Sequence, residues 1–251
     1  MGLLLTLVLG IFIIIGALIV FLVKNNDRFI EFSISLAFGV IVMLIFTDLL
    51  PEAYETINMG NEVIDTLIIM GGASFGFVLL SVLDKFIPDH DEECSHCHSH
   101  HENDNLRHIG IVSSLALVIH NIIEGMAIYL LFSNSIRAGL MASIGIGLHN
   151  IPLGMVIAST FYKSNNDKNE TILIMLLVSM STFVGGLIIF LFPTSGIISV
   201  VEPVSLIITL GMLSYISIME LLPRMLQARD KKNACVGMTI GIMLLLITLF
   251  L

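Results

Sequence analysis

The chain has 251 residues, of which 56% are hydrophobic and only 12% are charged, with a formal net charge of −9. Soluble domains contain about 25% charged residues, so this composition excludes a soluble enzyme. Apolar runs of roughly the 20 residues that a membrane-spanning helix needs recur along the chain, at 3–23, 31–50, 66–83, 109–131, 138–161, 171–192, 203–222 and 234–251.

The first run, 3–23, is predicted to be a spanning helix and not a signal peptide. It lacks a basic segment before it, and it exceeds the apolar stretch of about 7–15 residues that signal peptides contain. The third run, 66–83, and the seventh, 203–222, are weaker, because the third contains several glycines and the seventh contains Glu220. We predict an all-α membrane protein with eight transmembrane helices, in one domain over residues 1–251.

The distribution of Lys and Arg predicts how the helices are oriented. The odd-numbered loops between the eight helices carry ten of these residues, and the even-numbered loops carry Arg137 alone. Cytoplasmic loops hold the excess of positive charge. Both termini are therefore expected outside, and the acidic loop after the second helix is expected on the outer side.

The second and seventh runs resemble each other. Residues 38–51 read FGVIVMLIFTDLLP and residues 210–223 read LGMLSYISIMELLP, so an acid, Asp48 or Glu220, precedes Leu-Leu-Pro in both. The two helices cross in opposite directions, which predicts an inverted repeat of helices 1–3 and 6–8; such repeats place substrate sites near the midplane. The Gly-x-x-x-Gly pairs of the following helices are Gly72/Gly76 and Gly237/Gly241.

The loop at 85–108 is rich in His and Cys, reading HDEECSHCHSHH at 90–101. A single Cys-x-x-Cys is half of a structural zinc site, whereas a His-rich tract is typical of metal binding. We predict a cytoplasmic loop that collects or senses metal, with an inert linker as the alternative. The candidate ligands are Cys94, His96, Cys97, His98, His100 and His101.

Polar residues lie at the centres of the fourth and fifth runs. His120 and Glu124 are four residues apart and share one helix face, and His149 is central in the next helix. Ionisable residues at this depth indicate function, and imidazole with carboxylate suits Zn²⁺ or a similar ion. Asn121 and Asn150 can add oxygen ligands or hydrogen bonds to the ligands. The alternative is that these side chains only bond across the helices.

These motifs, HNIIEG at 120–125 and HNIPLG at 149–154, resemble the ZIP family of divalent-metal transporters. The sequence LLPEA at 49–53, eight helices and a His-rich third loop fit the same family. The resemblance covers the whole chain. It implies a 3+2+3 helix arrangement and transport into the cytoplasm through a site on helices four and five, by alternating access of an elevator-like kind.

The chain departs from the family pattern at two acids of a second metal position. Leu153 stands where the fifth-helix motif usually ends in Glu, and Thr182 aligns with the usual Glu of the sixth helix. Losing both predicts a site for a single metal ion. The family also places a Met ligand on the second helix; here Ile41 aligns with it and Met43 is close, so this ligand stays open.

We therefore expect an integral protein of the cell membrane that takes up zinc as its substrate and is not an enzyme, with Fe²⁺, Mn²⁺ and Cd²⁺ as alternative ions. Asp48 and Glu220 are either stations on the outer and inner sides of the site or solvated acids. An intramembrane metal-dependent hydrolase and a metal sensor without transport are the other hypotheses. Metal ions and lipid are the expected partners, without nucleic acid, and a homodimer is left open.

Overall fold

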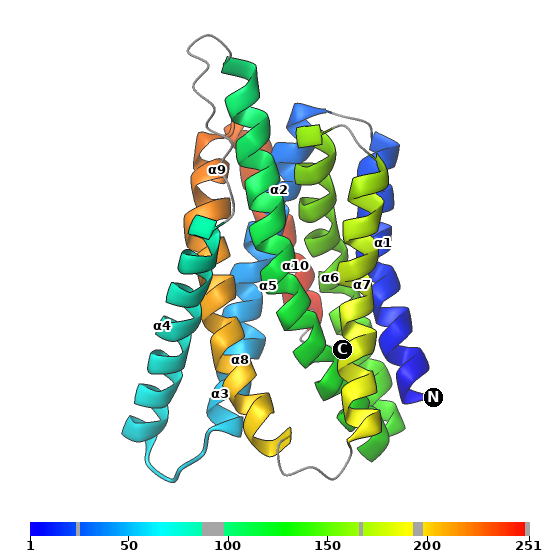
Figure 1. Cartoon of the computed structure of the whole chain (residues 1–251), viewed down its shortest axis with the longest axis vertical. Coiled ribbons are helices and arrows are strands. Elements are labelled where there is room, and N and C mark those ends of the chain that lie inside the picture. The colour runs from blue at the N-terminus through cyan, green and yellow to red at the C-terminus, as the bar shows by residue number, and fades with distance from the viewer. Residues whose placement is uncertain (24–25, 87–97, 166–167, 193–197, 249–251) are drawn as a thin grey trace.

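The computed structural model describes residues 1–23, 26–86, 98–165, 168–192 and 198–248. Over these residues it contains eight helical spans long and apolar enough to cross a membrane, which lie side by side in Figure 1. The predicted all-α fold and all eight apolar runs are confirmed. The main helices are α1 (Gly2–Val23), α2 (Asp27–Leu44), α4 (Glu62–Phe86), α5 (His98–Asn134), α6 (Ile136–Asn165), α7 (Lys168–Leu191), α8 (Ile198–Tyr215) and α10 (Lys231–Thr248).

The second and seventh spans each contain a wide π turn that ends at the first leucine of their Leu-Leu-Pro sequence. A proline inside a helix has no N–H to donate, and its ring clashes with the carbonyl four residues earlier. The wider turn before Pro51 or Pro223 accommodates that clash, and each turn carries the acid of the repeat, Asp48 or Glu220. The turns are η1 (Ile45–Leu49), which leads into α3 (Leu50–Thr56), and η2 (Ile216–Leu221), which leads into α9 (Leu222–Gln227).

The helices group into two bundles that contact each other less extensively than the helices within each contact one another. The α5–α6 bundle consists of α1, α5, α6 and α7. The α2–α10 bundle consists of α2, α4, α8 and α10, with η1, α3, η2 and α9. Between the bundles, α2 lies against α6 and α8 lies against α5. Each bundle draws helices from both halves of the sequence, and the 3+2+3 order stays a prediction.

Glycines set the closest contacts inside the α2–α10 bundle. A Cβ atom built on any of four glycines would lie 1.9–2.3 Å from a carbonyl oxygen of the facing helix, so only glycine permits these backbones to approach so closely. The two helix pairs use equivalent glycines of the sequence echo, as an inverted repeat requires. The contacts are Gly39 with Met238 and Gly241 with Leu36 between α2 and α10, and Gly76 with Ile208 and Gly211 with Ala73 between α4 and α8.

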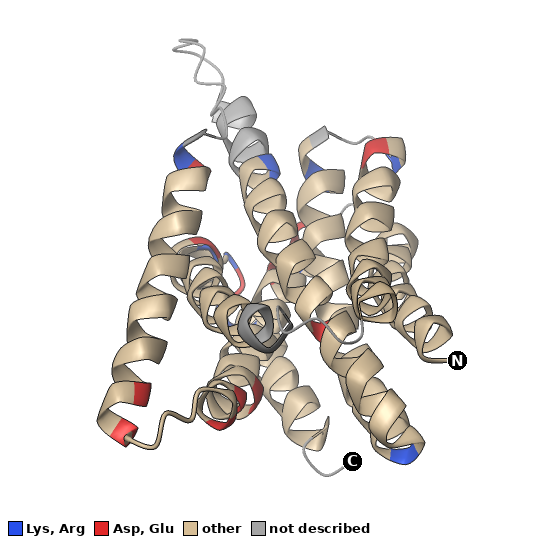
Figure 2. Ribbon diagram, turned by 60° about the horizontal axis from the view of Figure 1, so that its bottom comes forward, with Lys and Arg blue, Asp and Glu red and all other residues tan. Residues whose placement is uncertain are grey.

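Charged residues distinguish the two ends of the helices. Figure 2 shows most Lys and Arg positions at one end and a group of acids at the other. We call the first the basic end, which includes Lys85, Arg107, Lys163 and Arg224 among others, and the second the acidic end, which includes Glu52, Glu55, Glu62 and Asp65. The N-terminus of α1 lies at the acidic end (Figure 1).

Candidate metal centre

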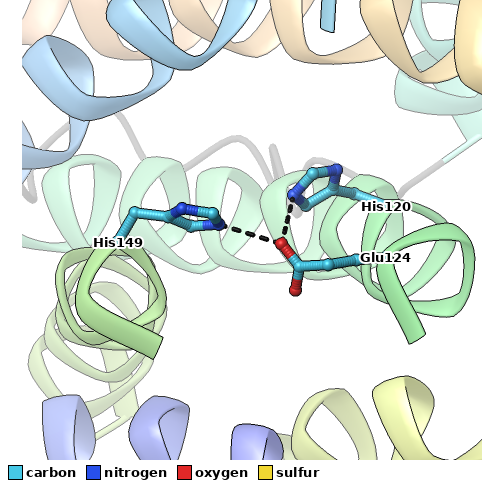
Figure 3. A group of neighbouring side chains, drawn as sticks. All are labelled: His120, Glu124 and His149. Atoms are coloured by element: carbon cyan, nitrogen blue, oxygen red, sulfur yellow. Dashed lines mark hydrogen bonds and ion pairs between the residues drawn. The ribbon is translucent and has the colours of Figure 1, made fainter. Parts of the chain in front are cut away.

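Two histidines and a glutamate from neighbouring helices converge between the two ends. His120 and Glu124 lie one turn apart on α5, and His149 faces them from α6 (Figure 3). The His149 Nε2 atom is 2.9 Å from Glu124 Oε1, and the His120 Nε2 atom is 3.6 Å from the same oxygen. One ligand atom from each of the three side chains lies within 4.8 Å of the others. The predicted group is thus brought together.

The burial of this group makes a bound cation chemically favourable. Glu124 is 8% exposed, His120 4% and His149 3%. An ionised carboxylate is costly to bury unless it is paired, and two imidazoles and one carboxylate are ligands that Zn²⁺ accepts. The three side chains leave a fourth coordination position for water or another ligand, because zinc sites are commonly four-coordinate.

The two asparagines of the HN motifs play different structural parts. The Asn150 amide nitrogen donates to Glu124 Oε2 over 3.1 Å, so it holds the carboxylate in place. The Asn121 amide nitrogen instead donates to the Val178 carbonyl oxygen over 3.2 Å, which joins α5 to α7. Asn150 therefore orients a candidate metal ligand, whereas the nitrogen of Asn121 stabilises the packing of the α5–α6 bundle.

A cavity of about 340 Å³ leads from the acidic end to this group. Its walls come from both bundles and include Asp48 and Glu52 at the acidic end. On α5 the described lining residue nearest the basic end is His120, and on α6 it is His149. The cavity therefore stops at the three candidate ligands, and an ion that entered it would meet them at its floor.

The residues at the predicted second metal position offer no charge. Leu153 is 1% exposed and belongs to the hydrophobic core, and Thr182 is fully buried. On the second helix the described residue that lines the cavity near the ligands is Leu44, rather than Ile41 or Met43. The sulfur of Met43 therefore does not line the cavity.

Other predicted residues lie away from the central group. Asp48 lines the cavity on the acidic side, whereas Glu220 lies near the basic end, close to Asp84 and His108. Sequence reasoning missed Asp84 and His108, which lie at the two ends of the third loop and belong to no motif. In the loop itself, Cys94, His96 and Cys97 are outside the described residues, as are the side chains of His98, His100 and His101.

Known proteins resemble this chain over nearly its full length. A family model described as the ZIP zinc transporter matches residues 88–249. A zinc transporter ZupT of Enterobacter is 30% identical over 99% of this chain and 96% of its own length. A zinc transporter ZupT of Chlorobium phaeovibrioides is 31% identical over 100% of this chain and 97% of its own length. A zinc transporter ZupT of Escherichia coli is 28% identical over 95% of this chain and 92% of its own length.

The different bonds of the two asparagines predict different effects on metal affinity. Asn150→Ala should weaken zinc binding by about 10–100-fold, as loss of a hydrogen bond to a metal ligand typically does. Asn121→Ala, a matched control with the same burial, should change the affinity only a few-fold while lowering thermal stability. Titration of the purified protein against a chelating competitor measures both. Equal losses of affinity in the two variants would contradict the distinction.

Proposed function

The chain belongs to the ZIP family of zinc transporters, and from this premise we propose that it carries zinc into the cytoplasm through His120, Glu124 and His149. The family consists of transporters, so the hydrolase hypothesis is set aside. The proposal rests on one observation: the cavity that opens at the acidic end stops at three buried groups that suit a divalent ion.

The proposed direction rests on the distribution of charge. Cytoplasmic loops are enriched in Lys and Arg, so the basic end is assigned to the cytoplasm and both termini to the outside. The open cavity then faces outward, and its acids Asp48 and Glu52 attract cations toward the floor. The His-rich loop lies on the cytoplasmic side, where we assign it a role in collecting or sensing metal.

The proposed mechanism is alternating access between the two bundles. The ligands His120, Glu124 and His149 all belong to the α5–α6 bundle, while part of the cavity wall, including Leu44 and Asp48, belongs to the other. A displacement of one bundle against the other can close the cavity behind a bound ion without breaking the ligand set. Separation of the bundles at the basic end would then expose the ion to the cytoplasm.

The charge of the site favours one ion at a time. Glu124 supplies a charge of −1, so one Zn²⁺ ion held by Glu124 and two neutral imidazoles leaves a net charge of +1. A second Zn²⁺ ion would raise this local charge to +3. Unit charges 4 Å apart repel by about 4 kcal/mol even at an effective dielectric near 20. Leu153 and Thr182 contribute no compensating charge, and we therefore assign a single zinc ion, completed by water, to the centre.

Replacement of the carboxylate tests the transport site. Glu124→Gln keeps the shape of the side chain but removes its charge, so zinc uptake into proteoliposomes should fall by at least about 100-fold, more than loss of a group that only orients a ligand. Ser113→Ala, which changes another buried polar residue of α5, should retain uptake. Near-normal uptake by Glu124→Gln at equal abundance would rule out this site.

The same assay separates the remaining hypotheses. Zinc binding to the unaltered protein without any flux would favour a sensor over a transporter. Competition by Fe²⁺, Mn²⁺ and Cd²⁺ during uptake would identify which of the alternative ions the centre accepts.

The number of ions at the centre is a further prediction. An anomalous-scattering map of zinc-loaded crystals should show one zinc between His120, Glu124 and His149, because the site carries only one acid. The double variant Leu153→Glu with Thr182→Glu should admit a second ion beside it, since it restores two charges. Two zinc ions at the centre of the unaltered protein would refute the single-ion site and leave the transport proposal standing.

A further inference from the structure

A second cavity lies at the basic end, beyond the packed side chains on which the central cavity stops. It has a volume of about 140 Å³, and its walls come from both bundles. Its lining includes Ile30 of α2, Leu106 of α5 and Lys163 of α6, and the contact between Lys163 and Asp27 lies in it. We call it the inner cavity. An ion that passed from the central site to the basic end through this cavity would cross the packed residues between the two.

One face of α2 runs from the central cavity to the inner cavity. Leu44 lines the first and Ile30 lines the second, and Ala37 lies seven residues from each. Because an α-helix has 3.6 residues per turn, residues seven apart share a face and lie about 10.5 Å apart along the axis. Gly39, which contacts Met238 of α10, lies on the opposite face. Ala37 is therefore directed away from α10 and toward the α5–α6 bundle.

The faces of α6 and α5 that carry the ligands continue in the same way. On α6, His149 lines the central cavity and Lys163 lines the inner cavity, and Val156 lies seven residues from each. On the antiparallel helix α5, Glu124 is hydrogen-bonded to His149, and Leu117 lies seven residues from Glu124 toward the basic end. Leu117 and Val156 therefore lie at the same depth, each two turns from a ligand and on its face.

Ala37, Leu117 and Val156 close the space between the two cavities. Each of the three side chains is at most 2% exposed and belongs to the hydrophobic core. We call these three residues the apolar layer. An unpaired ion is far more costly to bury than a polar group, and an apolar constriction closes a passage by excluding water. Zinc therefore does not cross the apolar layer in this conformation.

The apolar layer is divided between the two bundles. Ala37 belongs to the α2–α10 bundle, whereas Leu117 and Val156 belong to the α5–α6 bundle. The ion pair of Lys163 with Asp27, at the inner cavity, is likewise a contact between the bundles. Separation of the bundles at the basic end would thus part the layer and widen the inner cavity, while the packing within each bundle stays intact.

A wider cavity at the basic end does not continue these faces. It has a volume of about 400 Å³ and is lined by residues of α5, η2 and α9, including Met219. Among the described residues that line it, none comes from α2 or α6. The inner cavity, in contrast, shares α2, α5 and α6 with the central cavity.

From these observations we propose that zinc leaves the central site through the inner cavity, and that Ala37, Leu117 and Val156 form the barrier that parts to release it. The inference rests on the proposed function, because it takes the basic end as the side on which zinc is released. It requires the side chain of Ala37 to become accessible from the basic end during transport, although this side chain is fully buried in the present conformation.

Thiol modification during transport tests this requirement. Full-length chains whose native cysteines are replaced by serine receive Ala37→Cys and are placed in zinc-loaded proteoliposomes with the basic end toward the outer solution. Zinc then leaves the lumen in the proposed direction of transport, and a charged, membrane-impermeant thiol reagent is added outside. The mass of the recovered chain measures the modification. Val156→Cys, the counterpart on α6, serves where Ala37→Cys does not transport.

Ser35→Cys is the matched control. Ser35 is as deeply buried on the same helix, but it lies on the opposite face, where a Cβ atom built on Gly237 of α10 would lie 3.3 Å from the Ser35 Cβ atom. Ala37→Cys should be modified at least about tenfold faster than Ser35→Cys, because transport populates a conformation in which only the first faces solvent. Equal rates would overturn the proposal, as would zinc efflux from a chain whose Ala37→Cys stays unmodified. Absence of zinc efflux from the unaltered protein would instead overturn the transport function.

The effect of the modification on transport distinguishes the two cavities at the basic end. Met219 lines the wider cavity but not the inner cavity, and it is 52% exposed. Modified Ala37→Cys should transport zinc at least about tenfold more slowly than before modification, because a bulky group then fills the constriction. Modified Met219→Cys should keep its rate. Loss of transport in modified Met219→Cys alone would place the release route in the wider cavity and overturn the proposal.

Discussion

The burial of one carboxylate is the constraint on which the arrangement of the protein depends. Glu124 lies among packed helices, where an unpaired charge is costly, and hydrogen bonds from His149 and Asn150 offset that cost, while His120 lies beside the same carboxylate. Their positions require α5 and α6 to lie side by side with their HN motifs at the same depth. Close glycine contacts of these two helices with α7 and α1 hold that register, at Gly125 with Thr182 and Gly154 with Ile13.

The division into two bundles gives this buried site a way to open. All three central ligands lie in one bundle, so the ligand set can stay intact while its surroundings change. The wall that faces it is formed partly by η1, whose π turn carries Asp48, and the equivalent turn η2 carries Glu220 near the opposite end. Wide turns of this kind are frequent at functional sites. In the proposed mechanism, the two halves of the repeat supply an acid to each side of the centre.

Much of this architecture is readable from the sequence, because a spanning helix needs a long apolar run and an acid at membrane depth needs a partner. The eight spans and the His120–Glu124–His149 group follow from those two requirements. The residue of the second helix near the ligands was not predicted: the sequence left Ile41 and Met43 open, whereas Leu44 lines the cavity, since helix rotation is fixed by packing. Asp84 and His108 meet only through the fold, and the π turns depend on local relief of a proline clash that no periodicity reveals.

In the proposed mechanism, zinc held by Glu124 reaches the cytoplasm only when the bundles separate at the basic end. The contact between Lys163 of α6 and Asp27 of α2, 2.5 Å between nitrogen and oxygen, joins the bundles there. The direct measurement is zinc uptake by a chain with its native cysteines replaced and with Asp27→Cys and Lys163→Cys joined by a short bifunctional linker. We predict that uptake stops while zinc still binds at the centre, and that each single-cysteine chain treated identically transports normally. Undiminished uptake by the fully cross-linked protein would contradict this mechanism.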